Sequence, residues 1–102
     1  MIRRDGARLR IAGPVTLANA AAVLEEGRRH LAEGASTVDL GEVGEMDSSL
    51  LAAMLAWLRD ARGRGAPIAF VNPPQALRTI ARLYGVDDLL DGMNGRPADA
   101  AR

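Results

Sequence analysis

The sequence contains no cysteine and no lysine, and only three of its 102 residues are aromatic. The missing cysteines exclude disulfides, thiol catalysis and cysteine-ligated metal sites. With so few aromatic rings, the core must be mainly aliphatic, and the length suits one compact domain. All thirteen basic residues are arginines, balanced by thirteen acidic residues. This zero net charge argues against a general nucleic-acid binder.

Long apolar segments and targeting signals are also missing. The first residues lack the apolar part of a signal peptide, and the longest apolar run, residues 50–58, is about half of a membrane span. We therefore expect a cytoplasmic protein that meets a membrane only through a partner. The single histidine, His30, has no second imidazole to share a metal ion. No metal site, cofactor or enzymatic activity is predicted.

Strand and helix patterns alternate along the chain. Asp5-Gly6 between two short runs predicts a hairpin, which Gly13-Pro14 should end. The expected elements are strands at residues 1–4, 7–12, 37–40 and 68–71, and helices at about residues 17–33, 49–62 and 74–84. Strands that alternate with helices imply a largely parallel sheet.

The helices are expected to bury one side each. Thr16 is the predicted cap of the first helix, and Gly85 is expected to end the third. The predicted buried residues are Leu17, Ala20, Leu24, Gly27 and Leu31 in the first helix and Leu77, Ile80, Ala81 and Tyr84 in the third. Residues 86–90 are expected to form a short strand or helical turn. The single domain should thus span residues 1–90, followed by a flexible tail at residues 91–102.

Asp47, Ser48 and Ser49 stand at the predicted start of the second helix and offer the most distinctive chemistry of the chain. Each can cap a helix, so a purely structural role is the simplest interpretation. The alternative is that a hydroxyl at this helix N-terminus is a phosphorylation or partner-docking site. A phosphate there would be favoured by the helix dipole but opposed by the acidic residues nearby.

The second helix carries two adjacent apolar stripes, more than one sheet contact requires. One contains Leu51, Leu55 and Leu58, and the other contains Leu50, Met54, Trp57 and Ala61. Either the helix is held between the sheet and another helix, or the stripe with Trp57 is a partner-binding face, because Trp is enriched at binding hot spots.

These segments resemble the STAS domain family. Its signature is a strand ending in Asp-Leu, here Asp39-Leu40, followed by Asp-Ser-x-Gly-Leu at a helix start, here residues 47–51. The chain is most similar to the STAS subunits (MlaB-type) of the Mla phospholipid-transport ABC system. The further matching segments are Ala56-Trp57-Leu58, the strand at residues 68–71 with Asn72-x-Pro74, and Leu83-Tyr84-Gly85-Val86 with Leu89-Leu90. The resemblance covers residues 7–90.

The resemblance implies an α/β STAS fold, with a mixed, mainly parallel sheet of four to five strands and helices packed chiefly on one face. It also implies a non-enzymatic module that docks on the ATPase subunit of an ABC transporter for phospholipids. The module would be peripheral to the inner membrane through that complex. The implied partner-binding residues are Asp47, Ser48, Ser49, Leu50, Met54 and Trp57.

A second family role remains open, that of an anti-sigma factor antagonist whose partner is an anti-sigma factor kinase. By alignment, Ser49 takes the phosphoacceptor position, and Ser48 matches the Ser or Thr that Mla-type members place after the Asp. One departure is Leu50, where the family usually has Gly. We expect its bulk to hinder a kinase and favour constitutive docking. A lipid-binding STAS domain is a third possibility, although no cavity is indicated.

Overall fold

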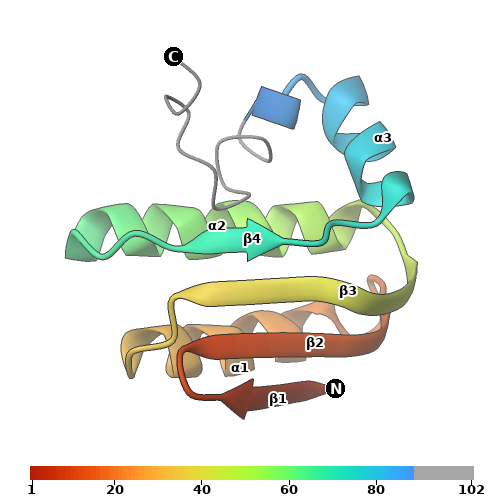
Figure 1. Ribbon diagram of the computed structural model, residues 1–102. Coiled ribbons are helices and arrows are strands. Elements are labelled where there is room, and N and C mark those ends of the chain that lie inside the picture. Colours follow the sequence, from red (N-terminus) through yellow and green to blue (C-terminus); the bar gives the residue numbers. More distant parts are fainter. Residues whose placement is uncertain (89–102) are drawn as a thin grey trace.

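The computed structural model describes residues 1–88, which form a four-stranded sheet and three helices (Figure 1). The elements in chain order are β1 (Ile2–Asp5), β2 (Arg8–Val15), α1 (Ala20–Ala32), β3 (Thr37–Met46), α2 (Ser48–Arg64), β4 (Ala69–Val71) and α3 (Gln75–Leu83). The sheet order is β1-β2-β3-β4, with β1 antiparallel to β2 and the other pairs parallel. The predicted fold class is confirmed.

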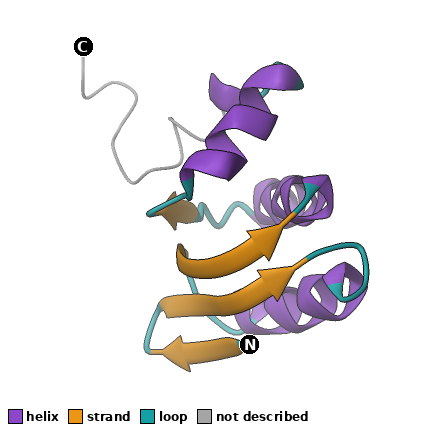
Figure 2. Cartoon of the chain, turned by 90° about the vertical axis from the view of Figure 1, so that its right-hand side faces the viewer, coloured by secondary structure: helices purple, strands orange, loops and turns teal. Residues whose placement is uncertain are grey.

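The parallel strand pairs β2–β3 and β3–β4 are connected through α1 and α2, and this topology fixes where the two helices begin. Because β2, β3 and β4 are parallel neighbours, α1 and α2 must each carry the chain back to the starting edge of the next strand. Both helices therefore begin at the same end of the domain, beyond the carboxyl ends of β2 and β3. They cover one face of the sheet, while α3 lies beyond the β4 edge (Figure 2).

Trp57 stands at the centre of the core. Its ring stacks near Phe70 of β4, with a centroid distance of 6.4 Å, and its Nε1–H donates to the carbonyl of Leu24 in α1 at 3.0 Å. Gly27 is required for this approach, because a Cβ there would lie 2.5 Å from the Trp57 ring. The indole thus packs α2 against both the sheet and α1.

The burial of α2 corrects one prediction. The side chains of Leu50, Met54 and Trp57 are all at most 1% exposed, so they cannot contact a partner. The two apolar stripes exist because α2 is held between the sheet and its neighbouring helices, which was the alternative interpretation.

The first helix begins later than predicted, at Ala20 and not at residue 17. The Thr16 carbonyl accepts hydrogen bonds from the N–H groups of Asn19 and Ala20, so a turn precedes the helix. Asn19, not Thr16, is the residue that precedes the helix. Leu17 is consequently outside the helical spacing and is exposed, contrary to the predicted inward face.

Two strands run further than predicted. β2 continues through Gly13 and Pro14 to Val15, because the missing N–H of Pro14 falls beyond the end of the short β1. β3 continues to Met46, since Glu42 and Val43 pair with Ala12 and Gly13 of β2. The register of this pairing is irregular on both sides of these two pairs. The stretch between the predicted strand at residues 37–40 and the second helix is therefore mostly strand.

The third helix buries Leu77 and Ala81 as predicted, whereas Tyr84 is exposed. Tyr84 directly follows the last helical residue, Leu83. Gly85 has a φ of +74°, which fits its predicted role in ending the helix. The predictions for Leu89, Leu90 and the tail at residues 91–102 lie outside the described residues.

Candidate functional site

Asp47 caps α2 and holds the serine pair in place. Its backbone is extended, and its Oδ1 accepts a hydrogen bond from the Ser49 N–H at 2.9 Å and another from the Ser49 hydroxyl. Ser48 is exposed, and Asp47 and Ser49 are half-buried. The structure therefore brings the three predicted polar residues together at an accessible tip of α2.

The second oxygen of Asp47 reaches a different crossover. Its Oδ2 accepts a hydrogen bond from the Leu17 N–H, at 3.0 Å, in the loop between β2 and α1. One carboxylate thus ties the start of α2 to the loop that precedes α1. The sequence pattern does not indicate Leu17 as a site residue, because its spacing predicts a position inside a helix. Asn19, a good capping residue type, was the signal for a later helix start.

These hydrogen bonds also set the charge of the site. The Ser49 hydroxyl, and then the N–H groups of Leu17 and Ser49, hold the pKa of Asp47 below its usual range. The carboxylate is therefore ionised at neutral pH and already occupies the positive end of the α2 dipole. The Asp47 carboxylate would repel an incoming anion. It would not repel a hydrogen-bond donor or an uncharged surface.

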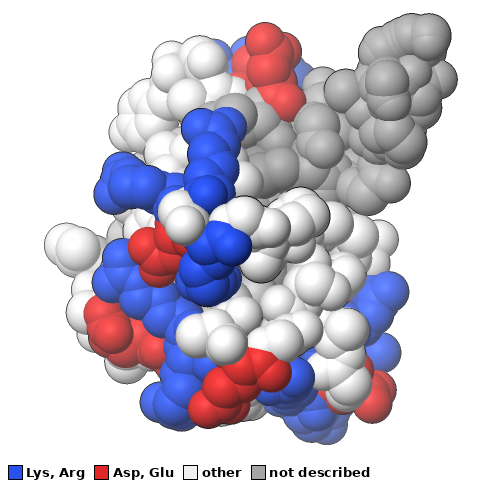
Figure 3. Space-filling view, turned by 90° about the vertical axis from the view of Figure 1, so that its left-hand side faces the viewer, with Lys and Arg blue, Asp and Glu red and all other residues white. Residues whose placement is uncertain are grey.

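The starts of α1 and α2 are uncharged. Residues 11–24 and 48–58, which include these starts, contain no Asp, Glu, Arg or His, whereas Glu42 and Glu45 are exposed in the last part of β3. The last halves of the two helices are rich in such residues, among them the ion pair of Arg28 with Asp60 at 2.7 Å. Figure 3 shows that opposite end of the domain, where basic and acidic side chains intermingle.

Asp39, the other acid of the family signature, holds neighbouring elements of the fold together. Its carboxylate accepts hydrogen bonds from the Arg8 guanidinium at 2.8 Å, the Gly41 N–H at 2.9 Å and the Asn72 side chain at 3.1 Å. Burial alone would raise the pKa of Asp39, but these hydrogen bonds outweigh it and lower the pKa. Asp39 thereby links β2, β3 and the loop after β4.

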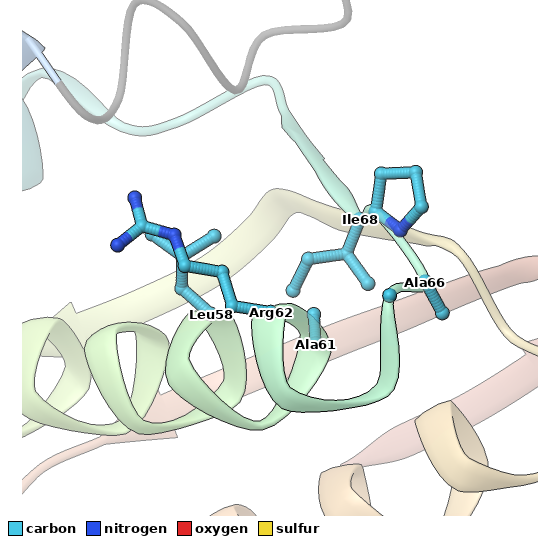
Figure 4. A pocket seen from close by; sticks show the side chains of 7 residues that line it. Leu58, Ala61, Arg62, Ala66 and Ile68 are labelled. Atoms are coloured by element: carbon cyan, nitrogen blue, oxygen red, sulfur yellow. The ribbon is translucent and has the colours of Figure 1, made fainter.

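A separate hollow lies at the other end of α2 (Figure 4). It has a volume of about 390 Å³ and is mostly apolar, with one charged side chain on its wall. Its lining residues are Leu58, Ala61, Arg62, Gly65, Ala66, Pro67 and Ile68. None of them belongs to the serine-bearing tip, so the hollow is not part of the candidate site.

Comparison with known proteins points to one family. A sequence model described as "Mlab, STAS domain" matches residues 1–91. No curated protein matches the sequence. None of the described helices is long and apolar enough to cross a membrane.

Several solved structures share the fold. The anti-sigma factor antagonist SpoIIAA in its unphosphorylated form is 16% identical, with a TM-score of 0.67 over 86% of this chain and 82% of that chain. An anti-sigma factor antagonist, described as putative, from Thermotoga maritima is 17% identical, with a TM-score of 0.69 over 88% and 81%. A sulfate transporter family protein from Wolinella succinogenes is 16% identical, with a TM-score of 0.64 over 84% and 72%. At these identities the similarity shows the fold alone.

Proposed function

The chain belongs to the MlaB-type STAS domain family, and from this premise we propose that it is a non-enzymatic docking subunit of an ABC phospholipid transporter. In this proposal it binds the cytoplasmic ATPase subunit, stabilises the assembly and tunes its activity. Its location at the inner membrane is then indirect, through the transporter. The ATPase, not this chain, hydrolyses ATP.

The observation that carries the proposal is the accessible tip of α2. Ser48 is exposed beside the half-buried Asp47 and Ser49, and residues 11–24 of the neighbouring crossover carry no charge. Such a surface suits a protein partner, because its hydrogen-bonding groups fix orientation and its uncharged residues cost less to desolvate than charged ones. The buried Leu50, Met54 and Trp57 are excluded from this contact.

Copurification with the transporter ATPase tests the proposal. Ser48→Trp places a bulky ring at the tip, and we expect it to weaken binding at least about tenfold, equivalent to about 1.4 kcal/mol. The matched control is Ala32→Trp, which adds the same ring at an exposed position at the other end of α1. Equal binding by the two variants, or no binding by the unmodified chain, would contradict the proposal.

The competing function is that of an anti-sigma factor antagonist controlled by phosphorylation. The fold similarity extends to the phosphorylated form of SpoIIAA, with a TM-score of 0.62 at 16% identity over 86% of this chain and 85% of that chain. The prediction that Leu50 would hinder a kinase is wrong, because its side chain is fully buried beneath the tip. Ser49 thus remains the predicted phosphoacceptor in this alternative, with Ser48 as the second candidate.

Phosphate-affinity gels of the protein from cells separate the two functions. A Ser49-dependent, stress-dependent phosphorylated band, lost in Ser49→Ala, would favour the antagonist. A single unphosphorylated band together with ATPase copurification that survives Ser49→Ala would favour the transporter subunit.

A further inference from the structure

Leu17 is the most exposed of the large apolar side chains in the described chain, at 82%. Its backbone is nevertheless held on both sides. The Leu17 N–H donates to Asp47, and the Asn19 side chain accepts from the Thr16 N–H at 2.9 Å and donates to the Pro14 carbonyl at 2.9 Å. The loop therefore presents an apolar side chain from a fixed position.

The location of Leu17 is as informative as its exposure. The hydrogen bond to Asp47 places it beside the start of α2, and Asp47 in turn holds Ser49. A loop that is already braced loses less conformational freedom on binding than a mobile one, which favours affinity. Leu17 combines exposed apolar area, a braced backbone and contact with the serine-bearing tip.

We propose that Leu17 is the apolar anchor of the docking surface and inserts into an apolar pocket of the partner ATPase, with Asp47 as its positioning residue. This inference rests on the proposed function and assigns the apolar contact to the loop before α1 in place of the buried face of α2. Ser49 joins the arrangement because its hydroxyl shares the Asp47 carboxylate with the Leu17 amide. A negative charge at Ser49 would repel that carboxylate and so disturb the anchor.

Binding of the purified full chain to the transporter ATPase tests the anchor. Leu17→Ala is expected to weaken binding about tenfold or more, as hot-spot truncations do. Leu83→Ala is the matched control, because Leu83 is also exposed, at 78%, but lies at the end of α3. Equal affinities of Leu17→Ala and the unmodified chain, or equal losses in the two variants, would overturn the anchor.

The positioning role of Asp47 is tested by two measurements that distinguish it from a general effect on stability. In the free chain, Asp47→Ala should increase amide hydrogen exchange at Leu17. Asp47→Ala should lower the affinity for the ATPase much less in the Leu17→Ala background than in the unmodified chain, because Asp47 acts through Leu17. If Asp47→Ala lowers the affinity by the same factor in both backgrounds, or leaves amide exchange at Leu17 unchanged, the positioning role is wrong.

The outcomes keep the two proposals apart. If the unmodified chain binds and Ser48→Trp abolishes binding while Leu17→Ala does not, the docking function stands and the anchor is wrong. If the unmodified chain does not bind the ATPase, the proposed function is wrong and the anchor assigned to that partner is wrong with it.

Discussion

The tip of α2 and its middle differ in what holds them. At the tip, hydrogen bonds of Asp47 fix the geometry and leave Ser48 in solvent. In the middle, Met54 and Trp57 are enclosed between the sheet and the neighbouring helices. Substitutions in the middle should therefore act on folding, and substitutions of the exposed Ser48 at the tip should act on recognition. This difference teaches that apolar character alone does not identify a partner surface on a helix.

Trp57→Ala should have the largest effect on stability. Loss of a fully buried aromatic side chain costs about 3–5 kcal/mol, a large part of the roughly 5–15 kcal/mol that stabilises a domain. The cavity would open between α1, α2 and β4, where the indole contacts Phe70 and Leu24. Urea denaturation measures the effect, and an unchanged midpoint would place Trp57 outside the core.

Gly27→Ala should follow, with a cost of about 1–3 kcal/mol from overpacking. The new methyl group would lie 2.5 Å from Cζ2 of Trp57. Gly63→Ala is the control within the same layer, because nothing lies within 4 Å of the methyl group that it would add and alanine favours a helix.

A double mutant sharpens the test of this contact. Because Phe lacks the atoms that meet the methyl group, Gly27→Ala should cost less in a Trp57→Phe background, measured by the same denaturation. Equal costs in the two backgrounds would show that the glycine is not required by the indole.

Much of this architecture could be predicted from the sequence. The hairpin at Asp5-Gly6, the end of the third helix at Gly85, and the family fold all agree with the structure. These features depend on local turn chemistry or on motifs. The family resemblance is confirmed by the match over residues 1–91.

The errors have two causes: a local turn that the helical pattern concealed, and contacts between residues distant in sequence. Leu17 fits a helical pattern, but the turn that ends at Asn19 delays the helix and leaves it outside. Trp57 looked like a binding residue because the sequence does not show that Gly27, on a different helix, opens the space for its ring. The link from Asp47 to Leu17 is likewise a tertiary contact that no local pattern carries.

Asp47→Asn should have a smaller effect, with a defined pH dependence. The pKa of Asp47 is lowered in the folded chain, so its carboxylate stabilises the fold above the unfolded pKa of about 3.9. That stabilisation is lost as the pH falls through the folded pKa. The stability difference between the unmodified chain and Asp47→Asn should be constant from pH 7 to about pH 5 and shrink below about pH 4.

Urea denaturation at about pH 7 and about pH 3 measures that difference. The contribution of Asp39, whose pKa is also lowered, is common to both proteins and cancels. A difference that grows on acidification would mean that Asp47 does not stabilise the tip as a carboxylate.

Ser48→Ala should have the smallest effect on folding and gives the sharpest contrast with the middle of α2. The side chain is exposed, and substitutions at such positions usually change the free energy of unfolding by less than about 0.5 kcal/mol. Ser49→Ala is the neighbouring comparison, and it should cost more because the half-buried hydroxyl donates to Asp47. Both are measured by urea denaturation at neutral pH. If Ser48→Ala were as destabilising as Gly27→Ala, the tip would be a structural cap and the separation between recognition at the tip and folding in the middle would be lost.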